Sequence, residues 1–170
     1  MGIFDIFRKK QTEEKLSVFD DERYVYALSD FEKQQLLMDQ LTEMQKSALL
    51  VVLGVFVTTL IKENTYQREY ADSLLNHRIK MLGLTYESAV KNVDSSDKIH
   101  DVLITIGNRQ IIDILLNDLK YLLKLLVPLT MKYRDGVKIN QTAISYMYGI
   151  FVPIGYTKAE VYDHKDFLMY

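Results

Sequence analysis

The feature that most constrains the fold is an uncharged run, SALLVVLGVFVTTLI, which extends from Ser47 to Ile61 between Lys46 and Lys62. Such a run either crosses a membrane or lies in the centre of a protein core. Fifteen helical residues would reach only about 22 Å, whereas the hydrocarbon layer is roughly 30 Å thick. We therefore predict a buried helix. A transmembrane helix and a pair of strands are the alternatives, the latter because β-branched residues are frequent in the run.

The helix that contains this run is expected to begin upstream of it. Apolar residues recur at helical spacing at Leu37, Leu41, Met44 and Ala48, with polar residues between them. We predict one helix that is amphipathic at its start and apolar on all sides from Ser47 onward.

Capping signals divide much of the remaining chain into helices. Ser29-Asp30-Phe31-Glu32 and Thr157-Lys158-Ala159-Glu160 have the capping-box pattern. Gly83 follows an amphipathic stretch at a position typical of a helix end. Thr85 is expected to begin a short helix, and Asp94-Ser95-Ser96-Asp97 to form the turn before the next one. A last helix is predicted to run from Thr157 to the end of the chain.

A second very apolar helix is predicted from Arg109 to Tyr133. Its polar residues fall on a narrow stripe, at Asp113, Asn117, Lys120 and Lys124. Pro128 should kink this helix or end its regular hydrogen bonding. Residues 134–136 are predicted to end the helix.

These elements predict an all-α fold, a compact single-domain helical bundle. We expect about five to seven helices around two very apolar central ones. Residues 1–28 would form an amphipathic and acidic leader, docked or mobile, and residues 29–170 the bundle.

The composition excludes several classes of protein. Of the 170 residues, 48% are hydrophobic and 26% charged, which is typical of a globular domain. There is no cysteine, so disulfides and thiolate metal sites are excluded. Residues 11–32 are strongly acidic, and no basic stripe follows, so we expect no nucleic-acid partner.

No catalytic constellation is evident, so we predict no catalytic residue and no cofactor. The chain has neither a glycine-rich phosphate loop nor a nucleophile elbow. The histidines are expected to be solvated or singly hydrogen-bonded. If the chain were a metal-dependent helical-bundle enzyme, its ligands would come from Glu69, His77, Asp97 and His100.

The first ten residues, MGIFDIFRKK, are a candidate contact surface for a membrane or a partner. On a helical wheel an apolar face is followed by cations, a pattern typical of helices that lie on anionic bilayers. The residues are Ile3, Phe4, Ile6, Phe7, Arg8, Lys9 and Lys10. The opening MGIF also resembles the amphipathic leader of phage-shock-protein-A-type membrane-binding proteins, a resemblance confined to this leader. The alternatives are a partner groove, docking on the protein's own core, or a disordered tail.

A second candidate surface lies in the uncharged, aromatic segment 139–157. Large aromatic residues dominate protein-interface hot spots, and the same residues would equally suit a core-packing helix broken by Pro153. The interface candidates are Tyr146, Met147, Tyr148, Phe151 and Tyr156.

We therefore expect a non-catalytic helical protein-binding module, a bacterial or phage accessory, assembly or inhibitor-type factor. Its partner would be an unknown protein or a second copy of the chain. The first alternative is a peripheral membrane protein that its N-terminal helix anchors to an anionic surface. The second is the metal-dependent enzyme. The expected location is the cytoplasm, or the inner face of its membrane.

Overall fold

The computed structural model describes residues 31–61, 65–130 and 134–163. These residues form eight α-helices and one π-helical turn, and none of them lies in a strand. The predicted all-α class is confirmed. The described residues contain one helix more than the predicted five to seven, and the segment expected to form one helix from Leu37 to Ile61 is divided.

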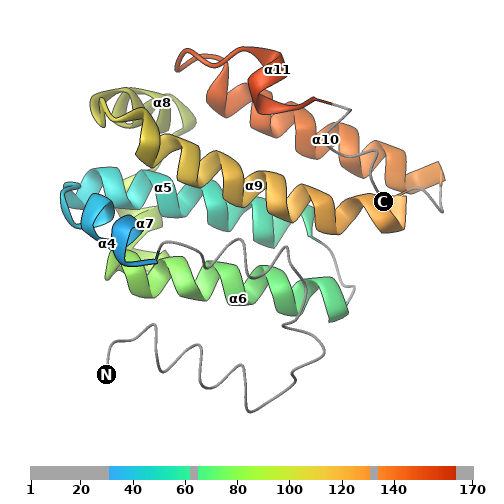
Figure 1. Ribbon diagram of the computed structural model, residues 1–170, viewed down its shortest axis with the longest axis horizontal. Helices are drawn as coiled ribbons and strands as arrows, with labels where there is room; N and C mark the ends of the chain where they lie inside the picture. The colour runs from blue at the N-terminus through green and yellow to red at the C-terminus, as the bar shows by residue number, and fades with distance from the viewer. Residues whose placement is uncertain (1–30, 62–64, 131–133, 164–170) are drawn as a thin grey trace.

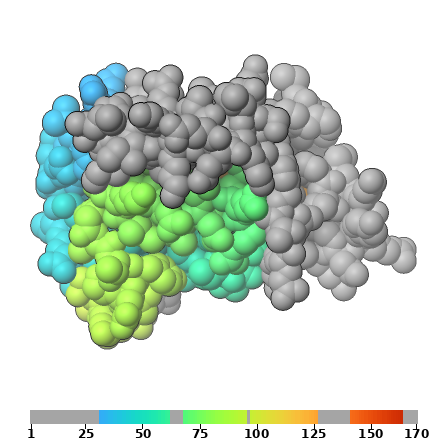
Figure 2. Space-filling view, turned by 90° about the horizontal axis from the view of Figure 1, so that it is seen from below, coloured from blue at the N-terminus to red at the C-terminus, as the bar shows by residue number. Residues whose placement is uncertain are grey.

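The long helices lie roughly side by side along the longest axis of the molecule (Figure 1). The elements in chain order are α4 (Phe31–Asp39), α5 (Glu43–Val55), η1 (Phe56–Leu60), α6 (Thr65–Leu82), α7 (Tyr86–Asn92), α8 (Ser96–Thr105), α9 (Arg109–Thr130), α10 (Arg134–Phe151) and α11 (Lys158–Val161). Figure 1 shows α9 between α6 and α10, and the short helices α4, α7 and α8 gathered at one end. On the face seen from below, green residues of α6 lie beside yellow-green residues around α7 (Figure 2).

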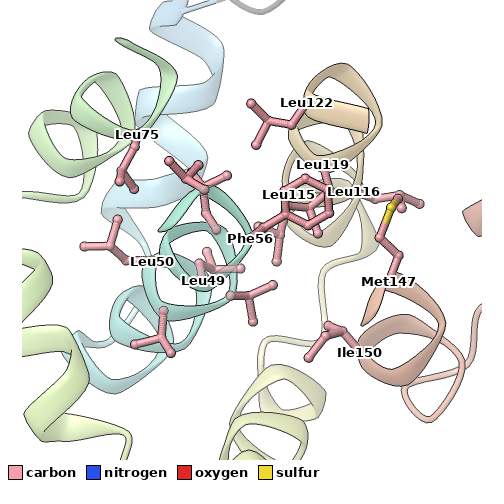
Figure 3. Packing of buried hydrophobic residues seen from close by; sticks show 14 of the residues in the cluster. Leu49, Leu50, Phe56, Leu75, Leu115, Leu116, Leu119, Leu122, Met147 and Ile150 are labelled. Carbon is pink, nitrogen blue, oxygen red and sulfur yellow. The ribbon is translucent and has the colours of Figure 1, made fainter. Parts of the chain in front are cut away.

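The apolar core is built by residues from α5, η1, α6, α9 and α10. Helix α9 packs along α10, whereas α5 packs against α6, α7, α8 and α9. Figure 3 shows Phe56 beside the leucines of α9, Leu50 near Leu75 of α6, and Met147 of α10 beside Leu116 of α9. Leu50, Phe56 and Met147 are fully buried. The uncharged run therefore supplies core residues.

The prediction of one helix from Leu37 through Ile61 is wrong. Helix α4 ends at Asp39, and α5 begins at Glu43 after the cap residue Thr42. The Thr42 hydroxyl accepts from the Gln45 amide at 3.2 Å, and the Gln45 side chain accepts from the Thr42 amide at 3.0 Å. This capping box satisfies two amides that a helix start leaves open, and it interrupts the helix without disturbing the apolar periodicity.

The end of the run is not a regular α-helix. Residues Phe56–Leu60 form a π-helical turn, η1. The Thr58 hydroxyl donates to the Gly54 carbonyl at 2.8 Å. The Arg68 guanidinium donates to the carbonyls of Ile61 at 3.3 Å and Val57 at 3.5 Å. A charged side chain from α6 thus satisfies carbonyls at the end of the run.

Three predicted boundaries are confirmed. Gly83 follows α6 with a φ of 69°, a left-handed conformation that favours glycine. Thr85 caps α7 and Ser95 caps α8, each by accepting from the amide three residues later.

Other predicted boundaries near the C-terminus are wrong. Helix α9 runs from Arg109 past Pro128 to Thr130, in agreement with the predicted helix, but residues 134–136, which were predicted to end it, are the first residues of α10. The box at Thr157 does open a helix, but α11 ends at Val161 and does not continue through Asp163. Tertiary context can override the helix propensity of single residues. The box predicted at Ser29 lies outside the described residues.

Candidate functional site

The structure divides the predicted aromatic surface into buried and surface residues. Met147 and Phe151 are fully buried, and Tyr156 is 6% exposed. Tyr146 and Tyr148 are half-buried. The first candidate surface, from Ile3 to Lys10, lies outside the described residues.

Tyr146 turns its polar end inward. Its hydroxyl donates to the Val52 carbonyl at 2.9 Å, and its ring lies 6.0 Å from that of Phe56. Burial raises the pKa of Tyr146, and the nearby hydroxyl of Tyr86 adds to this effect. Tyr146 therefore joins α10 to α5.

Tyr148 belongs instead to a group of four surface residues, which we call the tyrosine surface: Tyr148, Val152, Lys158 and Tyr162. Val152 follows Tyr148 by one helical turn, and its side chain is 37% exposed. The Lys158 ammonium lies 5.5 Å from the centre of the Tyr148 ring, within the range of a cation–π interaction. Burial raises the pKa of Tyr162, and electrostatic interactions with Tyr148 and Asp163 raise it further. The end of α10 and the region of α11 thus bring the four residues together.

The tyrosine surface rests on a rigid support. The Tyr156 ring packs edge-on against Phe151 at 5.6 Å, and its hydroxyl donates to Asp113 of α9 at 2.7 Å. The Arg109 guanidinium lies 4.3 Å above the same ring and pairs with Glu160 of α11. These contacts attach α11 to the beginning of α9.

A contact from α8 supports the same region. The Nε2 atom of His100 lies 2.7 Å from the carbonyl oxygen of Gly149, which directly follows Tyr148. No sequence motif marks this pair, because the two residues are far apart in the chain.

The residues named as metal ligands do not form a group of ligands. In the part of the chain that the structure describes, no three histidine, aspartate or glutamate side chains are placed to hold a metal ion. Glu69 and Asp97 are exposed, and His100 contacts Gly149. His77 is buried against the Phe31 ring, at 5.3 Å between ring centres.

His77 is neutral at physiological pH. Burial lowers its pKa from 6.5 to about 3, and the positive charges of Arg78 and Lys80 contribute to the shift. A proton-transfer role near neutral pH would require a value close to the working pH, so this histidine is not placed for one.

The most buried charges form a structural pair. Arg78 of α6 binds Asp118 of α9 through two parallel bonds, Nε to Oδ2 at 2.7 Å and Nη2 to Oδ1 at 2.9 Å. The third arm of Arg78 donates to the Gln34 side-chain carbonyl oxygen at 2.7 Å. A cavity of about 10 Å³ lies beside the pair, which is room for about one water molecule and not for a substrate.

One described segment is long and apolar enough to cross a membrane. It spans Glu43–Leu60, and 56% of it is buried inside the protein. Core helices of soluble proteins have the same length and composition, so this property does not assign a location.

No family model, curated protein or solved structure matches this chain. The functional proposal therefore depends on the residues themselves.

Proposed function

We propose that this chain is a non-catalytic helical protein-binding module that binds its partner through the tyrosine surface. The observation that carries the proposal is the exposure of Val152 one helical turn after Tyr148, on a turn that packed and hydrogen-bonded residues support. Tyrosines with a partly exposed ring and an adjacent apolar residue are typical of interface hot spots, because they bury a large area at small entropic cost.

The charges around the tyrosine surface indicate the chemistry of the partner. Lys158 is exposed, and within the described ranges no carboxylate lies at ion-pair distance from its ammonium. Glu160, two residues later, is already engaged by Arg109 and by the Thr157 amide. We infer a protein partner that offers an apolar side chain to Val152 and a carboxylate to Lys158.

We also infer that the scaffold of this surface is a compact bundle around two very apolar central helices, α5 and α9. Support comes from α5, in which every residue from Ser47 to Gly54 is buried. In α9 most residues off the polar stripe are buried between Ile111 and Leu126. A rigid core of this kind would hold the surface in one conformation before the partner binds.

Site-specific photo-crosslinking in the cells that make the protein tests the proposal. A photoreactive phenylalanine would replace Val152, and a matched variant would carry it at Val90 of α7, which is 42% exposed. We expect a discrete crosslinked protein, or a crosslinked second copy, from position 152 and none of the same mass from position 90. Equal products from both positions would contradict the proposal.

A peripheral membrane role is the second candidate, and the apolar face and cations of the first ten residues support it. Vesicle flotation of the full chain and of a chain without residues 1–10 would test this role at low and high salt. Flotation of the full chain alone, weakened by salt, is the expected result for an anchor. A full chain that stays below the vesicles would reject it.

A further inference from the structure

The carbonyl of Gly149 lacks its usual helical donor. In an α-helix this carbonyl would accept from the amide four residues later, but that residue is Pro153, which has no amide hydrogen. The preceding carbonyl is normal, because Tyr148 accepts from the Val152 amide at 3.1 Å. Pro153 therefore leaves an open acceptor in the last turn of α10, between two residues of the tyrosine surface.

His100 of α8 supplies a donor at this position. Its Nε2 atom lies 2.7 Å from the Gly149 oxygen, and a carbonyl oxygen can only accept. The bond therefore requires a hydrogen on Nε2. A neutral imidazole with this tautomer and a cationic imidazole both carry that hydrogen, so either form can make the bond.

We propose that His100 is a positioning residue that replaces the amide missing at Pro153 and fixes the end of α10 against α8. The turn that follows carries Val152 and is closed by the Gly155 amide, which donates to the Val152 carbonyl at 3.1 Å. The importance of this turn for binding rests on the proposed function. The bond between His100 and Gly149 and the test of that bond are independent of the proposed function.

A double-mutant cycle on the full chain tests the proposal by amide hydrogen exchange. The variants are His100→Leu, Pro153→Ala and both together, with His100→Gln as the matched control that keeps a donor at a similar reach. In the wild-type background, His100→Leu should speed exchange of the Val152 and Gly155 amides roughly three- to tenfold, the effect of one net hydrogen bond. His100→Gln should change it less.

The Pro153→Ala background decides between a capping role and simple packing. The alanine introduced by this substitution has an amide that can bond to the Gly149 carbonyl, so His100→Leu should then have almost no effect on exchange. An equal effect in both backgrounds would overturn the proposal, because His100 would then act through packing alone. No effect in the wild-type background would also overturn it.

A measurement on the unmutated protein guards against variants that fail to fold. Long-range ¹⁵N–¹H correlation spectra distinguish the two imidazole tautomers. We expect the Nε2–H form or the cation for His100, and a neutral ring with its hydrogen on Nδ1 would contradict the proposal. These results do not involve a partner, so they remain interpretable if the tyrosine surface binds nothing.

Discussion

At the scale of single residues, Gly54 and Gly149 both lie in helices, but only Gly149 has room for a larger side chain. The Tyr86 ring of α7 packs on the backbone of α5 at Gly54, where an added Cβ would overlap it. At Gly149 of α10, an added Cβ would meet nothing within 4 Å. We predict that Gly54→Ala lowers the free energy of unfolding by about 1–3 kcal/mol. Gly149→Ala should raise it by about 0.5–1 kcal/mol. Urea unfolding measures both changes, and a Gly54→Ala protein as stable as the wild type would contradict the packing described.

The buried pair of Arg78 and Asp118 should be sensitive to the loss of one charge. Asp118→Asn leaves the Arg78 guanidinium buried without its counter-charge, and we expect a loss of about 3–5 kcal/mol in unfolding free energy. Glu87→Gln is the matched control, because it removes a carboxylate from the exposed pair with Lys91. That change should be below about 0.5 kcal/mol. Similar losses in the two variants would show that burial of the first pair has no energetic consequence.

His77 should make stability depend on pH. In the unfolded chain it binds a proton below pH 6.5, whereas in the folded protein it does so only near pH 3. The part of the unfolding free energy that depends on a neutral His77 is therefore complete above pH 6.5 and is lost as the pH falls toward 3. Between pH 7 and pH 5 we predict a loss of about 2 kcal/mol in unfolding free energy from this residue. Urea unfolding of His77→Leu at both values should show a smaller pH dependence, and an unchanged dependence would reject the assignment.

At the scale of helices, the Thr42 capping box separates α4 from α5. Thr42→Ala should lower the free energy of unfolding by about 1 kcal/mol, because the Gln45 amide at the start of α5 loses the hydroxyl that accepts from it. Thr59→Ala, at an exposed position in η1, is the control and should be close to neutral. Denaturant unfolding measures the change in both variants. Equal losses of unfolding free energy in Thr42→Ala and Thr59→Ala would show that the capping box does not stabilise the fold.

Helices whose signals are local could be predicted from the sequence. Gly83, Thr85 and Ser95 act through hydrogen bonds within a few residues, so their motifs identify real boundaries. The break at Thr42 also has a local motif, Thr-x-x-Gln, but the apolar periodicity that continues across it conceals the boundary.

Features that depend on contacts distant in sequence could not be predicted. Arg78 pairs with Asp118, which follows forty positions later, and His100 contacts Gly149, which follows forty-nine positions later. Among the predicted interface residues, the uncharged pattern alone could not separate the buried Met147 from the half-buried Tyr148, since both lie on α10. Which face of an apolar helix remains open depends on its neighbours, and here these include α9 and η1.

At the scale of the whole molecule, the described helices form an all-α scaffold with the tyrosine surface at the end of α10. Helix α5, which contains most of the uncharged run, contributes residues to the core, as predicted for a buried helix (Figure 3). We propose that the tyrosine surface binds a protein partner.

The first measurement is a binding titration of purified variants with the partner that crosslinking identifies. Val152→Asp would place a charge in the tyrosine surface, and Val90→Asp makes the same change at a similarly exposed valine on α7. We predict that Val152→Asp weakens binding about tenfold or more, as expected for a hot-spot position, while Val90→Asp changes it less than about twofold. Equal dissociation constants for wild type and Val152→Asp, with both proteins folded, would show that the tyrosine surface does not bind this partner.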